Sequence, residues 1–182
     1  ADELIEMAIN TTKEAGTYQC LEPSGGHGNL VDALLKFNAA NPKYIFNCDV
    51  VEIQDVNTKI LKEKYGKNPL IEVKMGDFMK YAIDKQYDYI VMNPPFRIKA
   101  KQFNIGGKPL SDYHFVERAY TMLRDGGILT AIIWQNSEKL LSEQVQKDFV
   151  RVVHRDEKFL EYHEDGKHVT KTVKITILKI QK

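Results

Sequence analysis

The chain has 182 residues, which fits one domain, and a domain of this size buries enough surface to fold without a disulfide or a structural metal. Hydrophobic residues make up 43% and charged residues 28%, and a formal net charge of +1 excludes a global basic field for nucleic acid. The longest apolar run, Ile128 to Trp134, is too short to cross a bilayer and no signal peptide precedes the first predicted helix, so we expect a cytoplasmic protein. Cys20 and Cys48 lie in apolar stretches, and reduced core thiols are favoured over the alternative of a disulfide between them.

Hydrophobic spacing predicts helices and strands that alternate along the chain. Helices are predicted at Ala1 to Glu14, Asn29 to Asn38, Val56 to Tyr65, Phe78 to Asp84, Asp112 to Leu123 and Glu138 to Val150. Strands are predicted at Tyr18 to Glu22, Tyr44 to Val51, Ile71 to Met75, Tyr87 to Met92, Ile128 to Trp134, Phe159 to His163 and Thr172 to Ile180. Gly16 is expected to end the first helix, and Asp125-Gly126-Gly127 to form a turn after the fifth.

This alternation predicts a Rossmann-like, doubly wound α/β fold with a mostly parallel seven-stranded sheet and helices on both faces. An Asp165-Gly166 turn signal between the last two strands predicts a C-terminal antiparallel hairpin. Ligands of such sheets bind beyond the carboxyl ends of the strands. The residues that directly follow each strand therefore carry the functional information.

The first strand runs into a glycine turn that contains Gly26-x-Gly28, a pattern that lets the backbone approach a ligand closely. An ordinary turn is an equally weighted alternative. A dinucleotide site needs a small residue three positions after the second glycine, but this chain has Val31 there. Glu22 beside the turn would repel a diphosphate and suits a cofactor with a cationic amino group. These residues favour S-adenosylmethionine.

Acids also follow the second and third strands. Glu52 can accept the hydroxyls of a ribose, with Asp49 as the competing residue and a solvated surface acid as the alternative reading. Asp77 can accept a hydrogen bond from an adenine amino group or cap a helix, and the two uses are compatible. Phe78 offers a ring for packing.

The fourth strand ends at Asn93-Pro94-Pro95-Phe96, which is the strongest signal in the sequence. Two consecutive prolines fix the backbone and remove two N–H donors. The Asn93 side-chain oxygen and the Pro94 carbonyl can each accept one N–H of a conjugated amine, whose lone pair then points at an electrophilic methyl. Phe96 can stack on a planar group, so the tetrapeptide is predicted to be catalytic and to need no metal.

The glycine turn followed by Asn93-Pro94-Pro95-Phe96 resembles the class I S-adenosylmethionine-dependent methyltransferases, and is most similar to the N6-adenine-specific DNA methyltransferases. The resemblance covers nearly the whole chain and implies site-specific methylation of adenine N6 in DNA. It implies that Glu22, Gly26 and Gly28 face the methionine part of the cofactor. It also implies that Glu52 holds the ribose, that Asp77 holds the adenine and that the tetrapeptide holds the target amine. The residues expected to bind the cofactor are Glu22, Ser24, Gly26, Gly28, Glu52, Ile53, Asp77, Phe78 and Asn93.

The sequence departs from that family in three respects. His27 stands where the family has a small or hydroxylic residue, and the segment that often completes the methionine pocket upstream is not found. No target-recognition domain is recognisable, so residues 1–182 are expected to form a single methyltransferase domain. Sequence readout would then need a separate recognition subunit.

A basic stretch follows the tetrapeptide directly. The range from Arg97 to Leu110 has no acid, and Arg97, Lys99 and Lys101 are expected to contact phosphates beside a flipped-out base. A solvated loop is the equally weighted alternative. The hairpin tip, with His163, Lys167 and His168, is a weaker candidate, and no further ligand makes it a metal site.

Two other functions remain open. The same tetrapeptide suits an RNA adenine or a glutamine side-chain amide, although the glutamine enzymes usually have Tyr at the position of Phe96. The alternative from another class is a non-catalytic, methyltransferase-like binding subunit. The intact Asn93 and the intact glycine turn argue against that alternative.

Overall fold

The computed structural model describes residues 1–9, 14–80, 84–98, 109–162 and 168–182, without the side chains of 97–98, 159–162 and 168–169. The main sheet contains β1 (Gly16–Glu22), β2 (Tyr44–Glu52), β3 (Ile71–Met75), β4 (Tyr87–Met92), β7 (Leu123–Trp134), β8 (Phe149–Tyr162) and β9 (His168–Gln181). The helices are α1 (Asp2–Ile9), α2 (Asn29–Ala40), α3 (Asp55–Tyr65), α4 (Asp112–Thr121) and α5 (Glu143–Lys147), with a 3₁₀ helix, η2 (Ser137–Leu140). Two short strands, β5 (Arg97–Ile98) and β6 (Leu110–Ser111), pair antiparallel outside this sheet.

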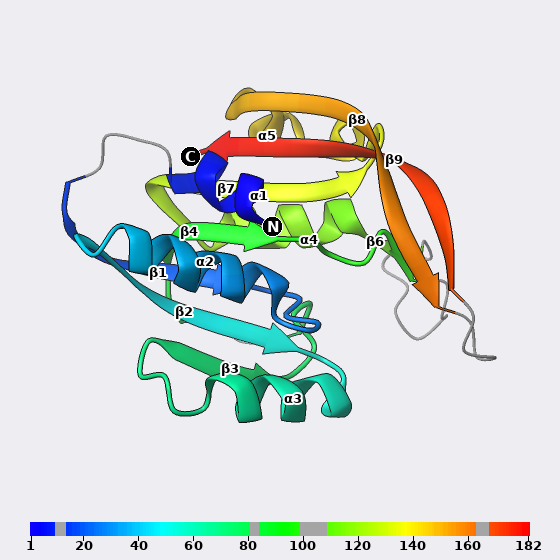
Figure 1. The fold of residues 1–182 in the computed structure, drawn as a ribbon. Helices are drawn as coiled ribbons and strands as arrows, with labels where there is room; N and C mark the ends of the chain where they lie inside the picture. The colour runs from blue at the N-terminus through cyan, green and yellow to red at the C-terminus, as the bar shows by residue number, and fades with distance from the viewer. Residues whose placement is uncertain (10–13, 81–83, 99–108, 163–167) are drawn as a thin grey trace.

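The seven strands are arranged in the order β3-β2-β1-β4-β7-β9-β8 (Figure 1). The first five positions are parallel, and β9 is antiparallel to both of its neighbours. The chain order of the strands reverses between β1 and β4, which is the position where ligands of such sheets bind. The predicted fold class is confirmed.

Helices cover both faces of the sheet, with α1 and α2 in front and α4 behind in Figure 1. Successive strand residues point to opposite faces, so each strand supplies side chains to two cores. Cys20 and Val50 pack in the core below α1, α2 and α3, whereas Leu21 and Val51 pack in the core below α4. Burial on both faces explains the continuous apolar runs of the central strands.

The predicted helix at Phe78 to Asp84 is wrong for its described part. Residues 78–80 form a turn, in which the backbone N–H of Met79 donates to Asp77 Oδ1 at 2.9 Å. An Asp side chain that bonds the backbone two residues on favours a turn over a continuing helix. Residues 81–83 lie outside the described part of the chain.

The predicted helix at Glu138 to Val150 is also wrong. This segment forms η2, then the short α5, and β8 begins at Phe149. Ser142 caps α5 by accepting a hydrogen bond of 3.4 Å from the backbone N–H of Val145, so a new helix starts there. Residues 159–162 of the strand predicted at Phe159 to His163 form the end of the much longer β8, and residue 163 lies outside the described part of the chain.

Other element boundaries moved by smaller amounts. The helix predicted at Ala1 to Glu14 is described as α1 up to Ile9, residues 10–13 lie outside the description, and Gly16 opens a strand. The expected turn at 125–127 is a bulge inside β7, where the register against β4 shifts and Gly126 has a φ of 74°. The antiparallel hairpin is confirmed by the pairing of Tyr162 with His168, although the Asp165-Gly166 turn itself is not described.

Cys20 and Cys48 are free thiols, buried side by side in the register of β1 and β2. No helix in the described ranges is long and apolar enough to cross a membrane. These ranges also contain no group of three His, Cys, Asp or Glu residues with the geometry to hold a metal ion.

Candidate active site

A cavity of about 640 Å³ lies at the carboxyl ends of β1, β2, β3 and β4. Its walls include seven of the nine residues predicted to bind the cofactor: Ser24, Gly26, Glu52, Ile53, Asp77, Phe78 and Asn93. The other two, Glu22 and Gly28, are buried next to it and do not line it. Residues that follow four separate strands therefore meet at one position, as the parallel topology requires.

The glycine turn is held against β2 by backbone hydrogen bonds. Gly25 N donates to Val51 O at 2.9 Å, and Gly28 N donates to Gly25 O at 2.8 Å. Gly26 and Gly28 have φ values of 51° and 85°, a left-handed conformation that favours glycine. A Cβ atom on Gly28 would lie 2.3 Å from Tyr65 Oη, so this position also excludes larger residues by contact.

Glu22 lies beneath the turn with only 2% of its surface exposed. Its Oε1 atom accepts hydrogen bonds from the backbone N–H and the hydroxyl of Ser24, at 3.0 and 3.1 Å. Burial raises the pKa of the Glu22 carboxyl to about 8, against the lowering effect of the two bonds from Ser24, and the nearby Glu52 raises it further. Glu22 therefore shapes the wall of the cavity through Ser24.

Glu52 and Asp49 occupy different surroundings. Glu52 lines the cavity, and its two oxygens accept backbone N–H groups from Gly26 at 2.7 Å and Gln54 at 2.8 Å. Each carboxylate oxygen has a second lone pair that can accept a further hydroxyl. Asp49 instead accepts from Tyr87 Oη at 2.7 Å and forms an ion pair with Lys85 at 3.2 Å. Of these two acids, Glu52 is therefore the one that lines the cavity and has free acceptor capacity there.

Asp49 is buried, which alone would raise the pKa of its carboxyl. The hydrogen bonds from Tyr87 and Lys85 and the charge of Lys74 outweigh burial and hold that pKa below its ordinary value. Asp49 is thus charged, and its carboxylate oxygens are bonded to Tyr87, Lys74 and Lys85.

Asp77 and Phe78 form the wall after β3. Asp77 caps the turn through Met79 N and pairs with Lys80 at 3.7 Å, which leaves its carboxylate partly exposed to the cavity. The Phe78 ring is 3% exposed and stacks on Phe115 with centroids 5.6 Å apart. The predicted ring is present at the cavity, but most of its face is covered by α4.

The tetrapeptide follows the end of β4 without regular secondary structure and with a bend at Phe96. Asn93 and Pro95 are exposed, Pro94 is buried and Phe96 is partly buried. Asn93 also lines a second cavity, of about 500 Å³, whose walls come from α1, α2, β7 and β8. Asn93 therefore lines both cavities. Ser111 Oγ lies 2.6 Å from the Phe96 carbonyl oxygen, which connects the tetrapeptide to the start of α4.

The predicted substrate contacts fall mostly outside the described residues. Lys99 and Lys101 lie in 99–108, and His163 and Lys167 lie in 163–167. Arg97 opens β5 and His168 opens β9, but their side chains are not described. His27 is exposed on the glycine turn and lines neither cavity.

Several lining residues carried no distinguishing signal in the sequence. Leu110 and Phe115 complete the cavity wall opposite Gly26, yet in the sequence they look like ordinary core residues of a helix and its approach. Gln54 and Asn57 line it from the start of α3. The capping position of Gln54 before α3 was the only sequence feature that could have placed it near the end of β2.

Residues 7–163 match the family model described as the methyltransferase small domain, so this chain belongs to that family. Family membership supports a methyl-transfer activity. Comparison with curated protein sequences finds no match.

Solved structures share the fold at low sequence identity. A candidate RNA methyltransferase from Pyrococcus horikoshii has a TM-score of 0.69 at 17% identity, with 100% of this chain and 83% of that chain covered. A candidate class I S-adenosylmethionine-dependent methyltransferase from Listeria monocytogenes has a TM-score of 0.69 at 14% identity, over 100% and 57%. The methyltransferase subunit of a type I restriction-modification system from Streptococcus thermophilus has a TM-score of 0.68 at 12% identity, over 100% and 43%. This chain thus spans only about half of the latter two proteins.

Proposed function

We propose that this chain transfers a methyl group from S-adenosylmethionine to the N6 amine of adenine in DNA. The observation that carries the proposal is the position of Asn93 between the cavity lined by Glu52 and Asp77 and the second cavity beside α2. A methyl donor in the first cavity and an amine in the second would meet at this side chain.

The first cavity suits S-adenosylmethionine in size and in chemistry. Glu52 has acceptor capacity for ribose hydroxyls, Asp77 has a partly exposed carboxylate for an adenine amine, and the left-handed glycines let the backbone approach the ligand. Glu22 is buried beneath the turn and reaches the wall of this cavity through Ser24. S-adenosylmethionine supplies an electrophilic methyl on a sulfonium.

The residues of the tetrapeptide would activate the amine. The side-chain oxygen of Asn93 and the carbonyl of Pro94 each accept one N–H, which frees the nitrogen lone pair for in-line attack. These acceptors bind more strongly as positive charge develops on nitrogen, so they stabilise the transition state more than the ground state. Phe96 stacks on the ring that carries the amine. As the N–C bond forms, the bond between the methyl group and the sulfonium sulfur breaks, S-adenosylhomocysteine leaves, and the methylated nitrogen then releases one proton to water. No general base is required at the start.

The choice of DNA is supported by the likeness of the tetrapeptide to that of N6-adenine DNA methyltransferases and by the restriction-modification subunit among the similar folds. We further propose that residues 1–182 act as one methyltransferase domain and that a separate subunit reads the target sequence. RNA adenine is the second candidate, because the similar fold from Pyrococcus horikoshii is described as a candidate RNA methyltransferase.

The deciding experiment offers radiolabelled S-adenosylmethionine with DNA, RNA and protein pools in parallel. Label in DNA that is recovered as N6-methyladenine supports the proposal. Label confined to RNA selects the second candidate, and label confined to protein contradicts the nucleobase assignment. An absence of cofactor binding by calorimetry would contradict methyl transfer altogether.

Asn93→Ala should abolish label transfer while most of the cofactor affinity persists, because Glu52 and Asp77 supply the acceptors for the ribose and the adenine of the cofactor. Asn41→Ala is the matched control, since Asn41 donates to Phe37 O at 3.0 Å at the end of α2 and lines neither cavity. Equal activity of Asn93→Ala and the control would exclude the proposed role of Asn93.

A further inference from the structure

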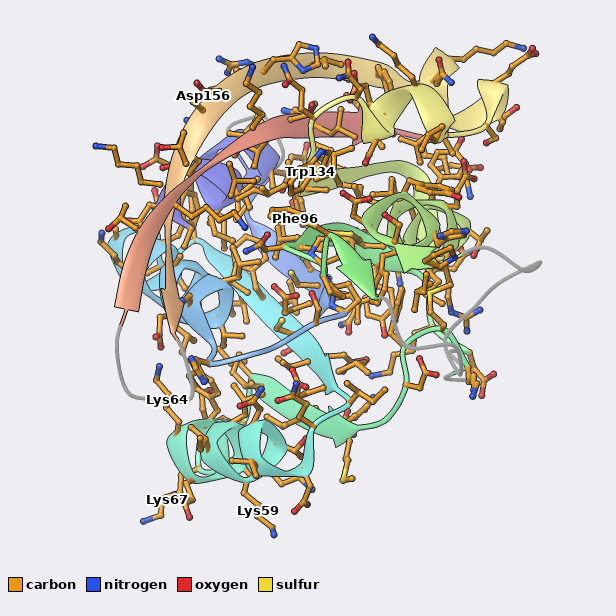
Figure 2. The ribbon with its side chains drawn as sticks, turned by 90° about the vertical axis from the view of Figure 1, so that its right-hand side faces the viewer. Lys59, Lys64, Lys67, Phe96, Trp134 and Asp156 are labelled. Carbon is orange, nitrogen blue, oxygen red and sulfur yellow. The ribbon has the colours of Figure 1, made fainter. Side chains whose placement is uncertain are left out.

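Trp134 is an exposed aromatic residue at the carboxyl end of β7, beside the tetrapeptide. Met92 pairs with Ala131 in the parallel register of β4 and β7, so the ends of these strands lie next to each other. The ring centroid of Trp134 is 5.7 Å from that of Phe96, with the two planes at 75°. Figure 2 labels both residues. Although 47% of Trp134 is exposed, one edge is fixed against Phe96.

Two rings at a steep angle form a corner. A planar group can stack on one ring while its edge contacts the other, and both arrangements are favourable for aromatic pairs. Trp134 is two residues beyond Ile132 on the same face of β7, and Ile132 lines the second cavity together with Asn93. The corner therefore adjoins the cavity in which the target amine is proposed to lie.

A buried carboxylate ties both aromatic residues in place. Asp112 is fully buried, and one of its oxygens accepts a hydrogen bond from the backbone N–H of Trp134. Ser111 Oγ lies 2.6 Å from Phe96 O and 2.7 Å from Asp112 Oδ1, and its single proton serves one acceptor at a time.

Burying a carboxylate is costly unless its oxygens are bonded. Asp112 bonds the backbone of Trp134 directly, and Ser111, whose proton goes either to Asp112 or to Phe96 O, lies between Asp112 and the backbone of Phe96. This pattern places the backbones of two segments that are distant in sequence beside the same buried carboxylate, and the two rings pack against each other there. Asp112 also accepts a hydrogen bond of 2.9 Å from the backbone N–H of Tyr113 in α4, so its contact with β7 is additional to this local bond.

We propose that Trp134 contacts the substrate, forming with Phe96 the surface that binds its planar ring, and that Ser111 and Asp112 are positioning residues for this pair. The inference rests on the proposed function and narrows its substrate. A purine is large enough to cover one ring and reach the other, whereas a glutamine carboxamide is not. The corner therefore selects a heteroaromatic amine.

Trp134 is the only tryptophan in the chain, so its fluorescence reports binding without any methyl transfer. The protein is titrated with an adenine-containing single-stranded oligonucleotide and, separately, with a glutamine-containing peptide. The oligonucleotide should quench the emission saturably, and the peptide should not. Equal responses to both probes, or no response to a bound oligonucleotide, would overturn the inference.

Substitution measures the contribution of the indole. Trp134→Ala should weaken oligonucleotide binding by about tenfold or more, the loss expected when one base-stacking contact is removed. Trp134→Phe should recover part of this loss, and cofactor affinity should not change in either variant. Leu140→Ala is the control, because Leu140 is a 61% exposed apolar side chain further along the chain in η2. A loss equal to that of the control would contradict the role of Trp134.

Ser111→Ala tests positioning. It should lower oligonucleotide affinity several-fold in the natural background and have no effect when Phe96 is already alanine, because both changes act through the same ring. Ser142→Ala, which removes the capping hydroxyl of α5, should leave binding intact. Additive effects of Ser111→Ala and Phe96→Ala would show that Ser111 does not act through Phe96.

The outcomes separate this inference from the proposed function. Quenching by the oligonucleotide without methyl transfer to any pool supports the aromatic surface and contradicts the enzyme. Normal N6-adenine methylation in Trp134→Ala, with unchanged KM, supports the enzyme and overturns the aromatic surface. If Trp134→Ala fails to fold, the KM of the Trp134→Phe variant decides, and an unchanged value overturns the inference.

Discussion

The Oε2 atom of Glu52 accepts a hydrogen bond of 2.7 Å from the backbone N–H of Gly26, which joins the end of β2 directly to the glycine turn. One carboxylate thus fixes the turn and still faces the cavity. The neighbouring acid of the same strand, Asp49, is instead paired with Lys85 and Tyr87.

Glu52→Gln should therefore weaken cofactor binding by about tenfold, since an amide has one acceptor oxygen where the carboxylate has two charged ones. Asp49→Asn should leave cofactor affinity unchanged and lower the melting temperature, because it removes the charge that Lys74 and Lys85 face. Calorimetry with S-adenosylmethionine and thermal unfolding of both variants check this. The reverse pattern would make Asp49 the binding acid.

The left-handed turn gives a prediction about stability. Gly28→Ala combines a φ of 85° with a Cβ 2.3 Å from Tyr65 Oη, whereas Gly126→Ala has a φ of 74° and an open surrounding. Gly126→Ala should cost about 1–2 kcal/mol from the backbone alone. Gly28→Ala should cost clearly more, because Tyr65 must also move. Urea unfolding measures both, and equal losses would show that contact with Tyr65 is unimportant.

The Glu22 carboxyl gives a prediction about pH. Its pKa is raised to about 8 in the folded protein, above the value of 4.5 of the free side chain. The folded state therefore binds more protons than the unfolded state between these values, and stability falls as pH rises from about 4.5 to about 8. Glu22→Gln keeps the acceptor for Ser24 but has no proton to lose. Melting temperatures across this range should decline more steeply in the natural protein than in the variant, and parallel curves would contradict the raised pKa.

The basic stretch after the tetrapeptide remains a prediction from the sequence. Replacing both Lys99 and Lys101 by Ala should reduce the salt dependence of oligonucleotide binding by about 2 in the log–log slope, which is about one unit for each lost phosphate contact. Lys59 and Lys67, at the α3 end of the sheet in Figure 2, are the matched pair for a control double variant. Binding curves at several salt concentrations decide, and an unchanged slope in the Lys99 and Lys101 variant would exclude the phosphate contacts.

The parallel half of the sheet was predictable because its strands are buried on both faces and therefore appear as compact apolar runs. The outer half was not. The first ten residues of β8 carry exposed apolar side chains, such as Val150 and Val152, among charged ones, which obscures the two-residue alternation of a strand. Ser142 interrupts the helical spacing before it, but only the structure shows that its hydroxyl starts a new helix.

The cavity was predictable to the extent that its residues lie at the carboxyl ends of strands or within two residues after them. Ser24, Glu52, Asp77 and Asn93 do so, and all four line it. Asp112 was not predictable as a buried residue, since an acid in the first turn of a helix is ordinarily solvated and favoured there. Its burial depends on the backbone of Trp134, 22 positions later. Contacts of this kind follow from tertiary packing alone.

The position of β9 between β7 and β8 has a consequence for synthesis on the ribosome. In the described part of the chain, β8 pairs in the sheet with β9 alone, yet it emerges first. Until β9 follows, the backbone N–H and C=O groups of β8 have no neighbouring strand to pair with. This unpaired strand edge is open to aggregation. We therefore expect β9 to insert between β7 and β8 after both have been synthesised, and we expect this insertion to be a slow phase of folding.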